Sequence, residues 1–251
     1  MKKHKSVFQL MIRCNFYRVL GLLAVMMVLQ TGLFWLAFNR GFDAGVYGLE
    51  YVLEKSHIEL VFIGVFIAMD MFLRAGTGYE AEGKHNYTMM RLSVTRKEVY
   101  YWHFVSNVLY YLLFFMVQLL AVVMFGMIYL RVAPAEYITG QTLFLAFYRN
   151  NFCHSLLPLG DFPYLIRNIV IVIAAAMWSA YYPKEREKEK KKNWFNLFVF
   201  LPVLFIGEFG DYFYCSLLVI FGTVGILWKI SAIRKAELES RQEEVIEKVS
   251  N

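Results

Sequence analysis

The sequence predicts an all-α integral membrane protein with six transmembrane helices. Hydrophobic residues make up 59% of the 251 residues and charged residues only 18%, which is more apolar surface than a soluble chain of this length can bury. The apolar residues fall in runs that can cross a bilayer as helices. The net charge of +6 comes from Lys and Arg between the runs, a pattern that sets membrane topology and is not typical of nucleic-acid binding.

The chain begins with an amphipathic segment, residues 1–18. Its apolar residues share one face of a helix and its polar residues another, which predicts a helix lying in the membrane interface. The apolar residues are Phe8, Met11, Ile12 and Phe16. A signal peptide is the competing interpretation. We reject it because the apolar run that follows is too long, begins late and leads to no small-residue cleavage site.

Three apolar runs in the first half of the chain predict the first three spans. They are Val19–Phe38, Ile58–Leu73 and Phe104–Leu130. The first two are separated by an outer loop, residues 39–57. The third run is long enough to tilt in the membrane or to protrude from it.

The second half of the chain predicts three further spans and an outer segment between the third and the fourth. The aromatic, apolar part of that segment, residues 141–152, is expected to lie on the membrane surface. The fourth span is Ile166–Tyr182 and the sixth is Tyr212–Ile230. The fifth, Trp194–Gly207, has only 14 residues and covers about 21 Å at about 1.5 Å per residue, which is short for a bilayer.

The basic residues predict how the bundle of residues 19–230 is oriented. Of the 26 Lys and Arg residues, 21 lie before the first span, in residues 74–101, in residues 183–192 or from Lys229 onward. The other five are Arg40, Lys55, Arg131, Arg149 and Arg167. Because cytoplasmic loops are enriched in Lys and Arg, we expect a single domain in a cell membrane. Both termini are then cytoplasmic, including the charged helical tail, residues 231–251.

The loop between the second and third spans, residues 74–101, carries the clearest functional pattern. Apolar residues recur at three- and four-residue steps within Tyr87–Val99, which predicts a basic helix with one apolar stripe. Its stripe and basic rows are formed by Met89, Arg91, Leu92, Thr95 and Arg96. Such a helix cannot lie in hydrocarbon, so a cytoplasmic partner could bind it. The alternative is a solvated basic loop that only orients the flanking spans.

The run Glu82-Gly83 … Thr88-Met-Met-Arg-Leu92-Ser93-Val94-Thr95-Arg96 resembles the first cytoplasmic loop of ABC-2 type transporter permeases. In that family an acidic-Gly stretch precedes a Thr and then a Leu-Pro-Val-Ser-Arg-like sequence, which docks on a separate ATPase subunit. This chain has Ser93 where the family often has Pro, and Thr95 where it often has Ser.

The resemblance implies a transport subunit, not an enzyme, that works as a homodimer or heterodimer on cytoplasmic ABC ATPases. It implies a cytoplasmic coupling helix between the second and third spans. It also implies export, more often than import, of lipids, glycans, drugs or antimicrobial peptides, with no cofactor held by the chain itself. Two alternatives come from other classes: a non-transporting membrane scaffold or sensor, and an intramembrane enzyme.

Polar residues inside the predicted spans are the candidates for a translocation path. They are Gln30, Asn107 and Gln118. Hydrogen bonds between helices are the simpler interpretation of such residues. Asp70 lies four residues before Arg74, a spacing that predicts an ion pair at the inner end of the second span.

Motifs for catalysis and metal binding are weak. Residues 78–85 come close to a phosphate-binding loop, but His85 stands where a hydroxyl residue is needed. Residues 207–211 resemble the Gly-x-Gly-Asp of intramembrane aspartyl proteases, but the predicted topology places Asp70 and Asp211 at different depths, too far apart to share a proton.

The cysteines and histidines give no clear site either. Cys14, Cys153 and Cys215 have no short spacing, so they predict neither a metal site nor a disulfide framework. His103, at the entrance of the third span, is expected to be an interfacial residue.

Overall fold

The fold is seen in a computed structural model that describes residues 2–43, 48–75, 96–158, 160–180 and 212–250. Within these residues, every regular element is helical. Four of the described helices are long and apolar enough to cross a membrane. A fifth span results if the bent pair α2 (Leu49–Lys55) and α3 (Ile58–Ala75) counts as one. The predicted all-helical membrane class is therefore confirmed, whereas the predicted span 194–207 lies outside the described residues.

Two helices are longer than the sequence predicted. The interfacial segment 1–18 and the first span form one helix, α1 (Lys2–Asp43). The last residues of the predicted coupling helix likewise belong to the third-span helix, α5 (Arg96–Val132). No proline occurs in either stretch, so nothing in the backbone chemistry ends these helices where the polarity of the sequence changes.

The other span helices begin or end away from their predicted bounds. The predicted outer loop 39–57 contains α2, which meets α3 at a 46° bend, where His57 has a φ of 48°. The helix α8 (Phe162–Ser179) starts before the predicted Ile166, with Pro163 in its first turn, where a missing N–H costs nothing. The sixth span and the charged tail form one helix, α11 (Tyr212–Ser250).

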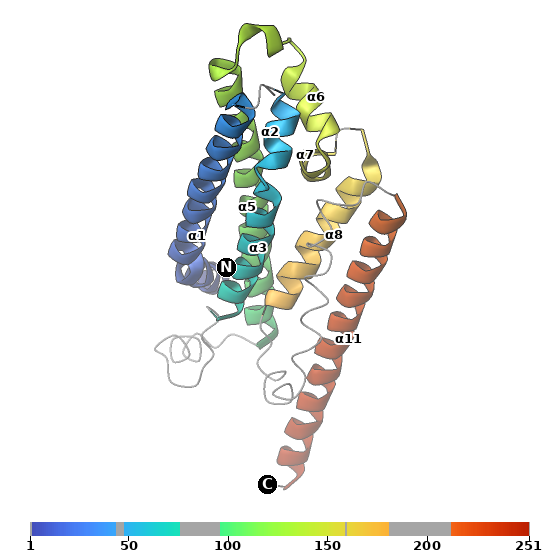
Figure 1. Ribbon diagram of the computed structural model, residues 1–251. Helices are drawn as coiled ribbons and strands as arrows, with labels where there is room; N and C mark the ends of the chain where they lie inside the picture. The colour runs from blue at the N-terminus through green and yellow to red at the C-terminus, as the bar shows by residue number, and fades with distance from the viewer. Residues whose placement is uncertain (1, 44–47, 76–95, 159, 181–211, 251) are drawn as a thin grey trace.

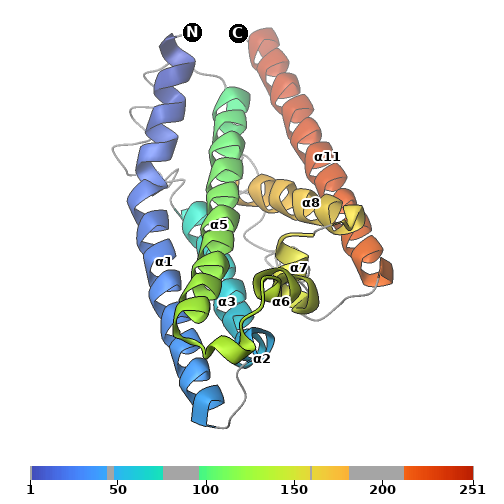
Figure 2. The ribbon, with the colours of Figure 1, turned by 90° about the horizontal axis from the view of Figure 1, so that it is seen from above.

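The long helices pack in a chain of neighbours. Helix α1 contacts α3 and α5, α5 also contacts α8, and α8 contacts α11 (Figure 1). Seen along the view of Figure 2, α1 and α5 begin and α11 ends at one end of the bundle. We call this the loop end, because α3 ends and α5 begins there. The opposite end, which we call the cap end, carries α2, α6 (Thr142–Arg149) and α7 (Asn151–Leu156).

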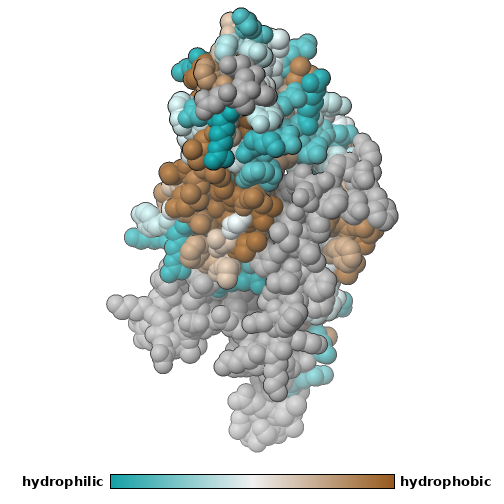
Figure 3. Space-filling model, in the orientation of Figure 1, coloured by the Kyte–Doolittle hydropathy of each residue, from teal (hydrophilic) through white to brown (hydrophobic). Residues whose placement is uncertain are grey.

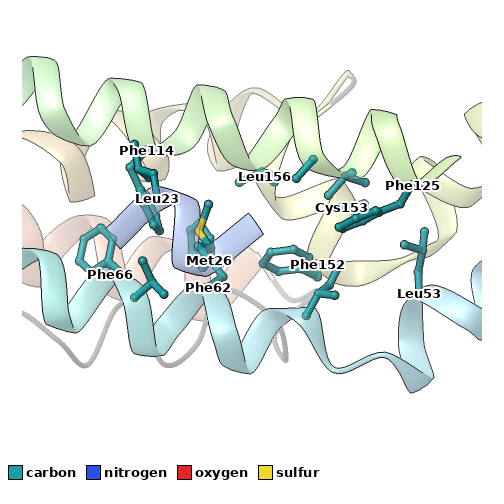
Figure 4. Close-up of a cluster of buried hydrophobic side chains, with 14 of the residues drawn as sticks. Leu23, Met26, Leu53, Phe62, Phe66, Phe114, Phe125, Phe152, Cys153 and Leu156 are labelled. Carbon is teal, nitrogen blue, oxygen red and sulfur yellow. The ribbon is translucent and has the colours of Figure 1, made fainter. Parts of the chain in front are cut away.

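An aromatic core lies between α1, α3 and α5. Phe62 packs against Phe114 and Phe152 with ring centroids 4.8 and 5.4 Å apart, and Phe34 stacks on Phe125 at 4.8 Å. Figure 4 shows Phe152, Cys153 and Leu156 of α7 between the positions of Phe114 and Phe125. The prediction that residues 141–152 lie on the membrane surface is therefore wrong at their end, because Phe152 is only 3% exposed.

The surface is that of a helical membrane protein. In Figure 3 hydrophobic residues form a band across the middle of the face in view, and hydrophilic residues gather toward the cap end. Side chains such as Leu112, Met116 and Leu120 of α5 are at least half exposed, as expected of positions that face lipid.

Candidate functional site

Buried polar side chains from three helices meet at the loop end, and we call them the loop-end cluster. Its members are Asp70 and Arg74 on α3, His103, Asn107 and Tyr111 on α5, and Ser179 on α8. All except Arg74 are at most 3% exposed. The cluster lies near the end of α3 and near the start of α5. These are the two helices that the predicted ATPase-binding loop connects in sequence.

The Asp70 carboxylate holds α3 and α5 together. Arg74 Nε lies 2.6 Å from Asp70 Oδ2, which confirms the ion pair predicted from the four-residue spacing. The Tyr111 hydroxyl donates to Asp70 Oδ1 at 3.1 Å. A carboxylate in a membrane protein is costly unless its oxygens are paired. Here Oδ2 forms an ion pair with Arg74 of the same helix, and Oδ1 accepts from Tyr111 of α5.

Asn107 joins α5 to α8. Its amide nitrogen donates to the Ser179 hydroxyl at 2.8 Å and lies 3.4 Å from His103 Nδ1. The Ser179 hydroxyl in turn lies beside that of Tyr111. The prediction that His103 is interfacial is wrong: it is 3% exposed. Because α5 begins at Arg96, His103 lies about two turns inside the helix and not at its start.

A second polar pair lies deeper in the bundle. Gln30 Nε2 donates to Gln118 Oε1 at 2.8 Å and to the Ile58 carbonyl at 3.3 Å, so it links α1 to α5 and α3. Gln30 Oε1 and Gln118 Nε2 have no hydrogen-bond partner among the described residues. Asn107 lies about three turns away along α5. The structure thus brings two of the three predicted path residues together and places the third in the loop-end cluster.

The predicted ATPase-coupling residues fall mostly outside the described residues. Met89, Arg91, Leu92 and Thr95 lie within residues 76–95. Arg96 is the first residue of α5. The segment that resembles the permease loop therefore runs directly into a helix that crosses the bundle.

One buried cation escaped the sequence analysis. Arg167 was counted only as one of the five Lys and Arg residues outside the cytoplasmic groups, yet it is 1% exposed on α8. A charged residue within an apolar run was the available signal. Its guanidinium lies over the Tyr164 ring, 5.0 Å from the centroid, and donates to the Ser155 carbonyl at 3.0 Å.

The buried polar contacts described above join helices to one another. No group of three His, Cys, Asp or Glu side chains among the described residues could hold a metal ion, and Cys153 and Cys215 are free thiols. No protein-family model, curated protein or solved structure matches the chain.

Proposed function

We propose that the chain is the membrane subunit of an ABC-2 type transporter, driven by a separate cytoplasmic ATPase. The observation that carries the proposal is the loop-end cluster together with its position. The run that resembles the permease loop ends at Arg96, where α5 begins, and the cluster ties α5 to α8 and α3 about three to four turns farther on.

This arrangement supports transmission of force from the loop to the spans. An ATPase that moves residues 87–96 acts on a helix of 37 residues. The bonds of Asp70 to Tyr111 and of Asn107 to Ser179 then carry α3 and α8 along with α5. Movement of packed helices as one body is a common way to switch between states. The loop end is cytoplasmic in this scheme, in a cell membrane, and both chain termini lie on that side.

The cargo and assembly follow from the resemblance. The proposed transporter exports a lipid, a glycan, a drug or an antimicrobial peptide, as a homodimer or with a second permease subunit. Gln30 and Gln118 offer polar groups between α1 and α5, where a path through the bundle would need them. Asn107 helps to position α8.

The test is a pair of loop variants in the full chain. Truncating a central interface residue commonly costs more than about 1 kcal/mol, whereas a peripheral charge costs little. Leu92→Asp should leave the protein inserted but reduce the ATPase that co-purifies in mild detergent and abolish ATP-dependent transport. Lys84→Ala, the matched control, should behave nearly as the wild type.

Two outcomes oppose the proposal. If Leu92→Asp keeps both properties while Lys84→Ala loses them, the coupling residues are wrongly assigned. If no ATPase co-purifies with the wild-type chain, a scaffold or sensor is the better description.

A further inference from the structure

Helix α7 inserts its apolar side chains into the core. Although it has only six residues, four of them are buried, and its apolar residues Phe152, Cys153 and Leu156 are 3%, 0% and 5% exposed. Phe152 packs against Phe62 of α3. Figure 4 shows the three side chains beside Phe62, between the positions of Phe114 and Phe125. A short helix thus fills space among the long helices.

Two neighbouring residues of α8 hold this helix, and we call them the clasp. Asn168 Nδ2 donates to the Ser155 carbonyl at 2.8 Å, and Arg167 Nη2 donates to the same oxygen at 3.0 Å. Arg167 also donates to Asn168 Oδ1 at 3.1 Å, so each clasp residue orients the other. A second link joins His154 to Asp161, with Nε2 and Oδ2 2.8 Å apart.

The chemistry of the clasp allows α7 to be released from the core. It grips the last carbonyl groups of a helix, which have no partner within the helix and which water can satisfy equally well. No described carboxylate forms an ion pair with Arg167. The closed state therefore buries a guanidinium against neutral oxygens, whereas opening allows both the cation and the carbonyls to be hydrated.

We propose that α7 is a releasable plug: the clasp holds it in the core, and its release opens the space beside α3 and α5 that its side chains fill. Loss of the clasp bonds weakens the hold on α7, which then depends on the link from His154 and on the packing of its apolar side chains. The plug's role as the outer gate of a transport path rests on the proposed function. The opening itself does not.

Cys153 reports the state of the plug. Its thiol is fully buried when α7 is in place, and burial raises its pKa to about 12, so the closed state leaves almost no reactive thiolate at neutral pH. The experiment uses the full chain in lipid nanodiscs, with Cys14→Ser and Cys215→Ser, and measures the rate at which N-ethylmaleimide labels Cys153.

The decisive variant is Asn168→Asp. Aspartate has nearly the same shape and can still accept from Arg167, but it cannot donate to the carbonyls of Ser155 and Leu156. Since loss of one such hydrogen bond is worth up to about a tenfold change in an equilibrium, labelling should accelerate about tenfold. Arg149→Gln is the matched control: it removes an exposed cation of the same cap that pairs with Glu50 of α2, and the rate should stay within about twofold.

Size-exclusion profiles and circular dichroism confirm that each variant is folded before labelling. The proposal is overturned if Asn168→Asp is labelled at the wild-type rate. It is also overturned if wild-type Cys153 reacts as fast as a cysteine placed at the exposed position Gln141. Neither measurement involves an ATPase or a cargo, so a chain that fails as a transporter subunit can still pass or fail this test.

Discussion

The two ends of the bundle are held together in different ways. At the loop end, side chains bond to side chains across α3, α5 and α8, as in the contacts of Asp70 with Tyr111 and of Asn107 with Ser179. At the cap end, the side chains of Arg167 and Asn168 bond to main-chain carbonyls of α7. The first arrangement joins long helices to one another, and the second holds a short helix by its end.

The difference indicates which end can open. Removing a partner at the loop end leaves another buried polar group unpaired, which is costly in a low-dielectric environment. Releasing α7 exposes groups that water can satisfy. We therefore infer that the loop end moves as a unit and that the cap end changes by local release, a division that suits a protein driven from one side.

The largest expected effect comes from the loop-end carboxylate. Asp70→Ala removes the carboxylate that pairs with Arg74 and accepts from Tyr111. Because Arg74 is partly exposed, we expect a loss of about 3 kcal/mol in the free energy of unfolding, at the low end for a broken buried pair. Unfolding of the full chain in dodecyl sulfate, followed by circular dichroism, measures it.

The matched change at the cap end is Asp161→Ala. Its carboxylate pairs with His154, and the two side chains are 31% and 17% exposed, so water can replace the lost partner and the expected loss is below about 1 kcal/mol. Equal losses for the two variants would remove the distinction between the ends.

A smaller effect is expected from two glycines. A Cβ at Gly222 of α11 would lie 2.5 Å from Val170 Cγ1 of α8, and a β-branched side chain has little rotamer freedom to withdraw. A Cβ at Gly126 of α5 would meet the end of the Leu143 side chain of α6, which can turn away on a short helix.

Substituting alanine at each glycine therefore compares how tightly the spans pack with how tightly the cap packs. Gly222→Ala should destabilise the chain by about 1 to 2 kcal/mol through overpacking, whereas Gly126→Ala should be near neutral because the gain in helix propensity offsets a small rearrangement. Gly32→Ala, with open space around its Cβ, is the control in the same unfolding assay. A greater loss for Gly126→Ala than for Gly222→Ala would contradict the inference that the cap adapts more easily.

The sequence predicts the spans better than it predicts what joins them. Apolar runs reveal α1, α5 and α8 because a bilayer demands them locally, and the four-residue step from Asp70 to Arg74 gives their ion pair. The contacts of Asn107 with Ser179, 72 residues apart, and of Gln30 with Gln118, 88 apart, depend on tertiary packing that no local pattern encodes. The burial of Arg167 was missed for the same reason, because its main-chain acceptor, the Ser155 carbonyl, lies on α7.

The smallest prediction concerns the pH dependence of the plug. The pKa of Cys153 is raised from an ordinary value of 9.0 to about 12 in the closed state, chiefly by burial. Because the raised pKa belongs to the folded state, its contribution to closure is complete below pH 9 and is lost as the pH rises toward 12.

Between pH 9 and pH 10, the ratio of open thiolate to closed thiol should still grow about tenfold, so maleimide labelling of Cys153 should accelerate by about that factor. A cysteine at Gln141 in a Cys153→Ser background is exposed in either state, and its labelling should less than double over the same interval, because about half of it is already thiolate at pH 9. If both cysteines level off together near pH 9, Cys153 titrates as a solvated thiol, and α7 is not closed over the core in the way that the cap-end contacts imply.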